Sequence, residues 1–226
     1  RLGDDGVLAL ICDSTNAMRE GTSPSEVEVS EGLEEVISQA TGRVAVTTFS
    51  SNVGRIRSIA LAAQAAGRRT LLLGRSMKRV VDVASELGYM DDIDDFISED
   101  EFGYIARDKV VEILTGSQGE PRAALAKLGR DEMRDVALTA GDTVVYSSRT
   151  IPGNEKAILE TKNRLIDMGI EIIEDTDALV HVSGHPRRNE LREMYQWTRP
   201  KSGVPVHGEA AHLSAHAKRM REGQIP

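Results

Sequence analysis

The sequence has 226 residues, enough for one large domain or two small ones with a substantial buried core. Lys and Arg number 28 against 36 Asp and Glu, a net charge of -8. This excludes a diffuse basic surface, so binding to nucleic acid would need a local phosphate-binding site. The single Cys12 excludes an internal disulfide framework and fits a reducing compartment. No stretch resembles a membrane span or a signal peptide.

Short apolar runs rich in β-branched residues recur along the chain and predict buried strands. These runs are residues 7–12, 44–49, 70–74, 109–114, 143–147, 170–173, 178–182 and 204–207. Amphipathic segments lie between most of them. In the first, Ser23 is the predicted N-cap, Pro24 the first helical residue and Glu26 the partner in a capping box. A second predicted helix covers 52–66. Alternating strands and helices predict an α/β fold with largely parallel sheets.

Most of the predicted strands end in a small polar turn. The turns read CDSTN, TFSSN, LGRSM, TGSQGEP, SSRTIPGN, VSGHP and VHGE. Ligands of open α/β sheets bind beyond the carboxyl ends of the strands, and hydroxyls, backbone N–H groups and helix N-termini suit phosphate. Ser and Gly also cap helices in most proteins, so the set predicts a phosphate site better than any single turn does.

All five histidines follow residue 180, which concentrates imidazole chemistry in the last fifth of the chain. His207 ends a predicted strand, where a neutral imidazole suits zinc; a core histidine facing Glu209 is the alternative. His212 and His216 are four residues apart, a spacing that can bind metal, but no third ligand accompanies them. We therefore predict that His212 and His216 are surface residues.

The motifs CDSTNA, GTSPSE, TTFSSNVGRI, GRSM, TGSQGEP, SSRTIPGNE, HVSGH and RPKSGVPVHGE, in this order, resemble the bacterial ribonuclease J family. This family belongs to the β-CASP branch of the metallo-β-lactamase nucleases, and the resemblance runs from about residue 3 to 226. It implies a metallo-β-lactamase segment at 1–23, a β-CASP domain at 24–180 and a return into the metallo-β-lactamase domain at 181–226. It also implies RNA processing and decay, as a 5′-to-3′ exonuclease and an endonuclease.

The resemblance further implies two Zn²⁺ ions per active site, with Mn²⁺ or Mg²⁺ as alternatives. It implies RNA substrates with 5′-monophosphate ends, RNA-decay partners, a homo-oligomer and a cytoplasmic location. The HxHxDH signature that supplies most of the family's metal shell does not occur in this sequence, and the chain enters a strand soon after Arg1. We therefore expect a piece of a longer protein, also without the family's C-terminal domain, that cleaves nothing alone. Ala210-Ala211 replaces an aromatic-basic pair common in relatives.

The resemblance assigns roles to particular residues. His207 would bind the second metal, and His185 would be the general acid that faces the scissile phosphate, oriented by Asp13. Asp13 also fits ordinary turn capping. The predicted phosphate-binding residues are His181, Ser183 and Gly184 near the metals, and Ser50, Ser51, Asn52, Arg55, Arg75 and Ser76 on the RNA backbone or its 5′-phosphate. For His181 the alternative is hydrogen bonding at a strand end, and for the serine and arginine turns it is helix capping.

Two other functions remain open from the sequence. One is a different β-CASP nuclease that acts on DNA or on mRNA 3′ ends, because the SGH and HGE motifs are partly shared among these enzymes. The other is a non-catalytic RNA-binding or scaffold module. The GRSM and GSQGEP motifs favour ribonuclease J over the first alternative.

Overall fold

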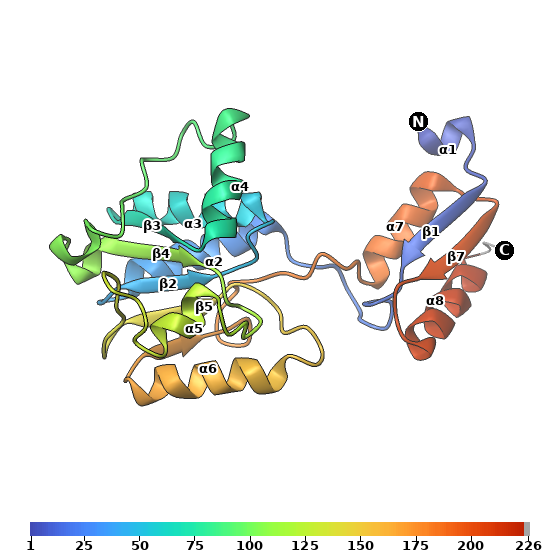
Figure 1. Cartoon of the computed structure of the whole chain (residues 1–226). Coiled ribbons are helices and arrows are strands. Elements are labelled where there is room, and N and C mark those ends of the chain that lie inside the picture. The colour runs from blue at the N-terminus through green and yellow to red at the C-terminus, as the bar shows by residue number, and fades with distance from the viewer. Residues whose placement is uncertain (224–226) are drawn as a thin grey trace. The chain divides into compact units, whose positions relative to one another are not determined.

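The computed structural model describes residues 1–223, and they form two compact units (Figure 1). Unit 1 contains Arg1–Pro24 and the chain from Ser183 onward; unit 2 contains Ser25–Val182. The chain therefore enters and leaves unit 2 close to the predicted boundaries at residues 24 and 180. Unit 2 is therefore an insertion in the sequence of unit 1, since the two segments of unit 1 come before and after it in the chain.

Unit 2 is built on a five-stranded sheet in which every strand pair is parallel, as the sequence predicts. The order is β3-β4-β2-β5-β6. The strands are β2 (Val44–Thr47), β3 (Arg69–Leu73), β4 (Val110–Leu114), β5 (Thr143–Tyr146) and β6 (Glu171–Ile173). The central strands β2, β4 and β5 are buried along their whole length, and their sequences are accordingly mostly apolar, with Glu112 the charged exception in β4.

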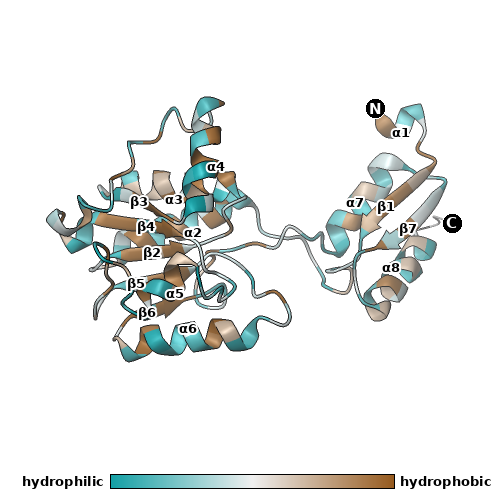
Figure 2. Ribbon diagram, in the orientation of Figure 1, coloured by the Kyte–Doolittle hydropathy of each residue, from teal (hydrophilic) through white to brown (hydrophobic). Residues whose placement is uncertain are grey.

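Helices cover both faces of this sheet. They are α2 (Glu26–Gln39), α3 (Val53–Ala65), α4 (Arg75–Glu86), α5 (Ala124–Leu128) and α6 (Glu155–Asp167), with short 3-10 turns at Phe102–Tyr104 and Arg107–Lys109. Side chains of α2, α3 and α4 pack against one face in a single apolar cluster. Side chains of α5 and α6 pack against the other. Unit 2 is thus a three-layer α/β domain whose apolar residues gather on the sheet (Figure 2).

The predicted strand at 178–182 is wrong, although its central residue is buried. Val180 is fully buried against the α2–α3 side of the sheet, which explains the apolar run. Its carbonyl accepts hydrogen bonds from Ser147 Oγ at 2.7 Å and from Arg55 Nη1 at 3.1 Å. Side-chain donors therefore satisfy this backbone where a neighbouring strand would otherwise do so.

The start of α2 also differs from the prediction. Its N-cap is Ser25, whose side chain accepts the Glu28 N–H at 3.1 Å, while the Glu28 carboxylate accepts the Ser25 N–H at 2.7 Å. The predicted box on Ser23 has the same spacing, but the Ser23 N–H donates to Glu190 within unit 1. The helix therefore begins after the chain has entered unit 2.

Unit 1 pairs the two ends of the chain. Strands β1 (Ala9–Asp13) and β7 (Ser202–Val206) run parallel, with Asp13 opposite Val206. The accompanying helices are α1 (Leu2–Asp5), α7 (Arg188–Thr198) and α8 (Ala210–Glu222). Ile11 of β1 and Leu8, which directly precedes the strand, are 68% and 75% exposed, so unit 1 presents apolar side chains at the surface here. Within residues 1–223, no helix combines the length and apolarity needed to cross a membrane.

Candidate functional site

Three of the predicted site residues meet in unit 1, at the carboxyl ends of β1 and β7. Asp13 is the last residue of β1, and His207 directly follows β7. Because the two strands are parallel and in register at Asp13 and Val206, both side chains reach the same edge. Asp13 Oδ2 lies 2.9 Å from His207 Nδ1. His207 adopts a left-handed conformation with φ +54°, a strain typical of functional turns.

His185 completes the cluster from the loop that precedes α7. Its Nδ1 lies 2.8 Å from the same Asp13 Oδ2, and its ring stacks on that of His207 with the centroids 5.2 Å apart. An ionised carboxylate only accepts hydrogen bonds, so His185 donates to Asp13 through Nδ1. Neither contact with Asp13 uses Nε2, which leaves the outer nitrogen of each ring for a ligand.

The environment of Asp13 favours the ionised carboxylate. Partial burial alone would raise its pKa, but hydrogen bonds from the Thr15 N–H and from His185 together lower the pKa below the ordinary aspartate value. The Thr15 N–H donates to Oδ1 at 2.8 Å and leaves Oδ2 to the imidazoles. Asp13 therefore caps its turn through Oδ1 and hydrogen-bonds His185 through Oδ2.

The chemistry of this donor set fits a zinc site. Asp13, His185 and His207 each offer a ligand atom, and these atoms all lie within 4.8 Å of one another. Carboxylate oxygen and imidazole nitrogen are zinc ligands, and catalytic zinc commonly has three protein ligands. A histidine that donates through Nδ1 to a carboxylate is also held in the tautomer that binds metal through Nε2.

Two residues that support the cluster were missed from the sequence. The Thr15 hydroxyl lies 2.9 Å from His207 Nδ1 and 3.2 Å from the His207 carbonyl oxygen. Ser14, fully buried, hydrogen-bonds His216 Nδ1 at 2.8 Å. Both residues belong to the same DSTN turn as Asp13, so their place next to Asp13 in the sequence could have identified them.

His216 is not a surface residue, and that prediction is wrong. Its side chain is fully buried, and it is hydrogen-bonded between Ser14 and the hydroxyl of Tyr195. Burial lowers the pKa of His216, so the ring is neutral and connects the two hydroxyls. Helical spacing could have predicted this burial, because His216 and Met220 are four residues apart and are the buried residues of α8.

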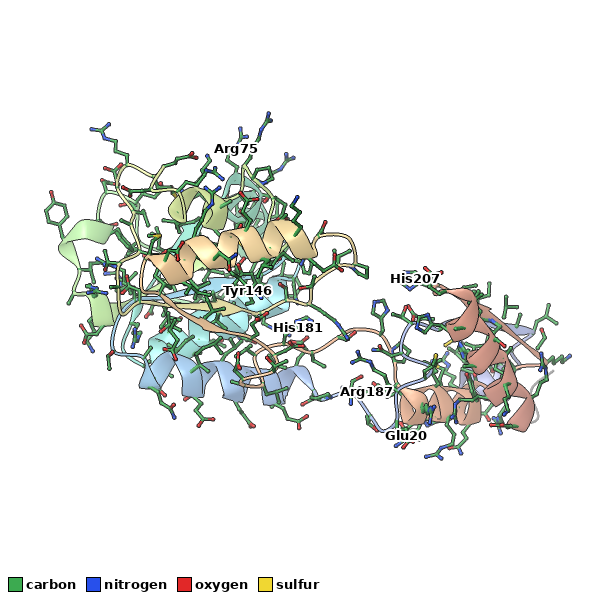
Figure 3. All side chains as sticks on the ribbon, turned by 90° about the horizontal axis from the view of Figure 1, so that it is seen from below. Glu20, Arg75, Tyr146, His181, Arg187 and His207 are labelled. Carbon is green, nitrogen blue, oxygen red and sulfur yellow. The ribbon has the colours of Figure 1, made fainter. Side chains whose placement is uncertain are left out.

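The HVSGH turn is divided between the two units. His181 lies in unit 2, where burial lowers its pKa and its Nδ1 is 3.5 Å from Arg55 Nη1. Ser183 lies in unit 1, and its hydroxyl accepts the His185 N–H at 3.3 Å. Gly184 is exposed beside it. Ser183 therefore fixes the backbone of the turn that contains His185. Figure 3 shows His181 in unit 2 and His207 in unit 1.

Arg55 was predicted to hold phosphate, and the structure contradicts this. It has no solvent exposure, and its Nη2 lies 2.7 Å from the Glu26 carboxylate. Its Nη1 donates to Ser147 Oγ at 2.6 Å and to the Val180 carbonyl at 3.1 Å. A guanidinium whose donors are used inside the domain cannot also bind an external phosphate, so Arg55 is structural.

The remaining predicted phosphate residues lie at strand ends of unit 2. Asn52 is the N-cap of α3, and its Oδ1 accepts the Arg55 N–H at 3.0 Å, in agreement with the capping alternative. Ser51 precedes it and is exposed. Ser50, Arg75 and Ser76 line a cavity of about 780 Å³ beyond β2, β3 and β4. Arg75 projects at the surface of unit 2 (Figure 3).

Comparisons with known proteins agree with this architecture. The ribonuclease J β-CASP domain matches residues 41–165, and the RNA specificity domain of Zn-dependent metallo-hydrolases matches residues 156–226. The fold and the Asp–His cluster thus define a chain that combines a β-CASP domain with part of a metallo-hydrolase. Since the first match covers more than half of the sequence, the chain belongs to the ribonuclease J family.

Individual relatives carry the same family name. The chain is 69% identical over 226 residues to a ribonuclease J of Sinorhizobium meliloti, covering 100% of this chain and 40% of that protein. It is 44% identical over 227 residues to the ribonuclease J of Mycolicibacterium smegmatis, covering 100% of this chain and 41% of that protein. It is 41% identical over 210 residues to that of Thermus thermophilus, 93% and 37%. The chain thus spans about two fifths of the length of these relatives.

Proposed function

We propose that this chain forms part of a metal-dependent ribonuclease that processes and degrades RNA. The observation that carries the proposal is the Asp13–His185–His207 cluster at the ends of β1 and β7, in a chain that belongs to the ribonuclease J family. Within this role we assign 5′-to-3′ exonuclease activity with a preference for 5′-monophosphate ends, together with endonuclease activity. The substrate is single-stranded RNA, and the active protein is a homo-oligomer.

His207 is the residue that we assign to metal. Its Nδ1 is directed to Asp13 and Thr15, so Nε2 is the nitrogen available for zinc. Bound zinc supplies polarisation of the phosphodiester and activation of water for attack. The other ligands, including those of a second zinc, would come from an HxHxDH segment, which this sequence does not contain.

His185 is the residue that we assign to proton transfer. The Asp13 carboxylate at 2.8 Å orients the ring, so that Nε2 is the nitrogen that donates a proton to the departing oxygen. Asp13 touches both imidazoles through one oxygen, which sets the two rings in a fixed relation. Ser183 and Gly184 hold a phosphate oxygen beside His185, and His181, Ser50, Ser51, Asn52, Arg75 and Ser76 contact the RNA elsewhere.

The test is to replace the 226 matched residues of the Sinorhizobium meliloti relative with this chain and to supply zinc or manganese. We expect degradation of single-stranded RNA, faster with a 5′-monophosphate than with a 5′-triphosphate. His185→Ala should lower the rate by about 100- to 10,000-fold, the usual contribution of a general acid. His212→Ala is the matched control, because this imidazole caps α8 and touches none of the three site residues in the described part of the chain.

The competing functions predict different outcomes. Equal cleavage of single-stranded DNA of the same sequence would favour a DNA-directed β-CASP nuclease. RNA binding with an unchanged rate in His185→Ala would favour a non-catalytic module. The chain alone, with the same RNA and metals, should show no hydrolysis, because His207 is the one metal ligand that we assign to it and catalytic zinc usually needs about three protein ligands.

A further inference from the structure

A buried polar link joins three elements of unit 1 near the Asp–His cluster. The side chain of His216, on α8, is fully buried, and so is that of Ser14. His216 Nδ1 lies 2.8 Å from Ser14 Oγ, and its Nε2 is hydrogen-bonded to the hydroxyl of Tyr195 on α7. The rings of Tyr195 and His216 also stack, with their centroids 6.0 Å apart. One imidazole thus connects the turn after β1 with both longer helices of unit 1 (Figure 1).

Each of the three connected elements also carries one residue of the cluster. Ser14 directly follows Asp13 in the sequence. Helix α7 begins three residues after His185, and helix α8 begins three residues after His207. The position of each histidine ring therefore depends on the helix that follows it. Because the link ties both helices to the turn of Asp13, it constrains all three side chains together.

The turn that contains Ser14 also fixes the backbone of both histidines. The Ser14 N–H donates to the carbonyl oxygen of His207 at 3.2 Å. Asn16, almost fully buried, donates through Nδ2 to the carbonyl oxygen of His185 at 3.0 Å. A displacement of this turn would therefore move both histidines relative to Asp13.

A neutral imidazole suits the central position of this link. It has one hydrogen-bond donor and one acceptor on different sides of the ring, so it can bond two hydroxyls at once. Burial makes this match important, because a buried polar group that loses its partner costs more than an ordinary hydrogen bond contributes. A leucine at residue 216 would occupy the space but would offer neither Ser14 nor Tyr195 a hydrogen bond.

We propose that His216 is a positioning residue, whose hydrogen bonds to Ser14 and Tyr195 set the spacing of the three cluster side chains. It acts through these neighbours and not by contact with RNA or metal. The proposal rests on the proposed function only for its effect on cleavage, since the spacing is a property of this chain without metal or RNA. The competing explanation is an ordinary core histidine, which would contribute stability and leave the cluster where it is.

The first experiment uses this chain without metal or RNA and records the proton–nitrogen correlation signals of the imidazoles at one fixed pH. His216→Leu removes both hydrogen bonds, so the signals of His185 and His207 should shift. His216→Gln supplies a donor and an acceptor through its amide and should return these signals to their original positions.

Met220→Ala is the matched control. Met220 is the other buried residue of α8 and has an apolar side chain. Its removal should lower the stability of unit 1, measured by urea unfolding through the fluorescence of Trp197, and leave the signals of His185 and His207 in place. Unchanged signals in His216→Leu, or the same shifts in Met220→Ala, would overturn the proposal.

The second experiment measures RNA cleavage and bound zinc in the Sinorhizobium meliloti protein carrying this chain. His216→Leu should lower kcat or zinc affinity about 10- to 100-fold, the usual effect of removing a group that orients a metal-site residue. KM should stay within about twofold, because His216 does not touch the substrate. His216→Gln should restore most of the loss, and Met220→Ala should cause none.

The two experiments separate the positioning role from the nuclease itself. An inactive hybrid with unaltered His216 would refute the proposed nuclease and leave the result on the metal-free chain standing. Full cleavage and full zinc content in His216→Leu would overturn the positioning role and leave the nuclease standing.

Discussion

Glu112 should make unit 2 less stable as the pH rises through the neutral range. It lies in β4 between Leu71 of β3 and Ala45 of β2, and its side chain is fully buried. Neither carboxylate oxygen has a hydrogen-bond partner among the described residues. Burial raises its pKa from 4.5 to about 8, against an opposing effect of Arg43. The folded domain therefore holds the proton that the unfolded chain releases near pH 4.5.

The sign and size follow from this difference. Below pH 4.5 Glu112 is protonated in both the folded and the unfolded state, so its ionisation does not change the free energy of unfolding there. Between pH 4.5 and about 8 the unfolded state releases the proton first, and the free energy of unfolding falls with rising pH. At about 1.4 kcal/mol per pH unit, the free energy of unfolding falls by about 5 kcal/mol at most. Relaxation of the protein around the charged carboxylate makes the actual fall smaller.

Glu112→Gln replaces the titrating acid with a neutral group of the same shape. We expect equal stability of variant and unaltered chain at pH 4, and a variant more stable by at least about 2 kcal/mol at pH 8.5. Urea unfolding followed by circular dichroism measures this, while the fluorescence of Trp197 reports unit 1 separately. Glu31→Gln, an exposed carboxylate of α2, is the control. A pH-independent difference between Glu112→Gln and the unaltered chain would refute the reasoning.

Two further predictions concern the stability of unit 2, measured by the same urea unfolding. Arg55→Ala should lower the free energy of unfolding by about 3 kcal/mol, because it removes a buried guanidinium from its partner Glu26. Arg57→Ala is the control and should lower it by less than about 1 kcal/mol, because the pair of Arg57 with Asp92 is exposed. Similar losses of stability in the two variants would contradict the structural role of Arg55. Gly119→Ala should cost more than about 3 kcal/mol, since its Cβ would lie 2.5 Å from the α6 backbone at Ala157. Gly153→Ala, with a positive φ but open space, should cost about 1–2 kcal/mol, and the reverse order would contradict the packing.

The fold class was predictable because its signal is local. Buried parallel strands such as β2 and β5 are mostly apolar runs, and amphipathic helices separate the strands. The run at 178–182 has the same appearance, but the Val180 carbonyl is satisfied by side chains of Ser147 and Arg55. Such partners are more than thirty residues away in the sequence, so no local pattern distinguishes this buried coil from a strand.

Motifs predicted which side chains would lie together, but not which ones would be buried. Asp13 ends β1, His207 follows β7 and His185 precedes α7, and the parallel register of β1 and β7 brings Asp13 and His207 to one edge. The roles of Arg55 and His216 depended on whether each side chain is buried. An arginine after a serine-rich turn looks like a phosphate ligand until Glu26 is known to lie 2.7 Å away. Sequence alone does not give that distance.

The most direct test of the account is the metal content of two variants of the Sinorhizobium meliloti protein carrying this chain. His207→Ala should lower both bound zinc and RNA cleavage, because we assign this imidazole to the metal. His185→Ala should abolish cleavage while zinc stays near the unaltered level, because we assign this imidazole to the departing oxygen. Asp13→Asn should reduce cleavage less than His185→Ala does. Equal loss of zinc from His185→Ala and His207→Ala would contradict this division of roles and would make both histidines metal ligands.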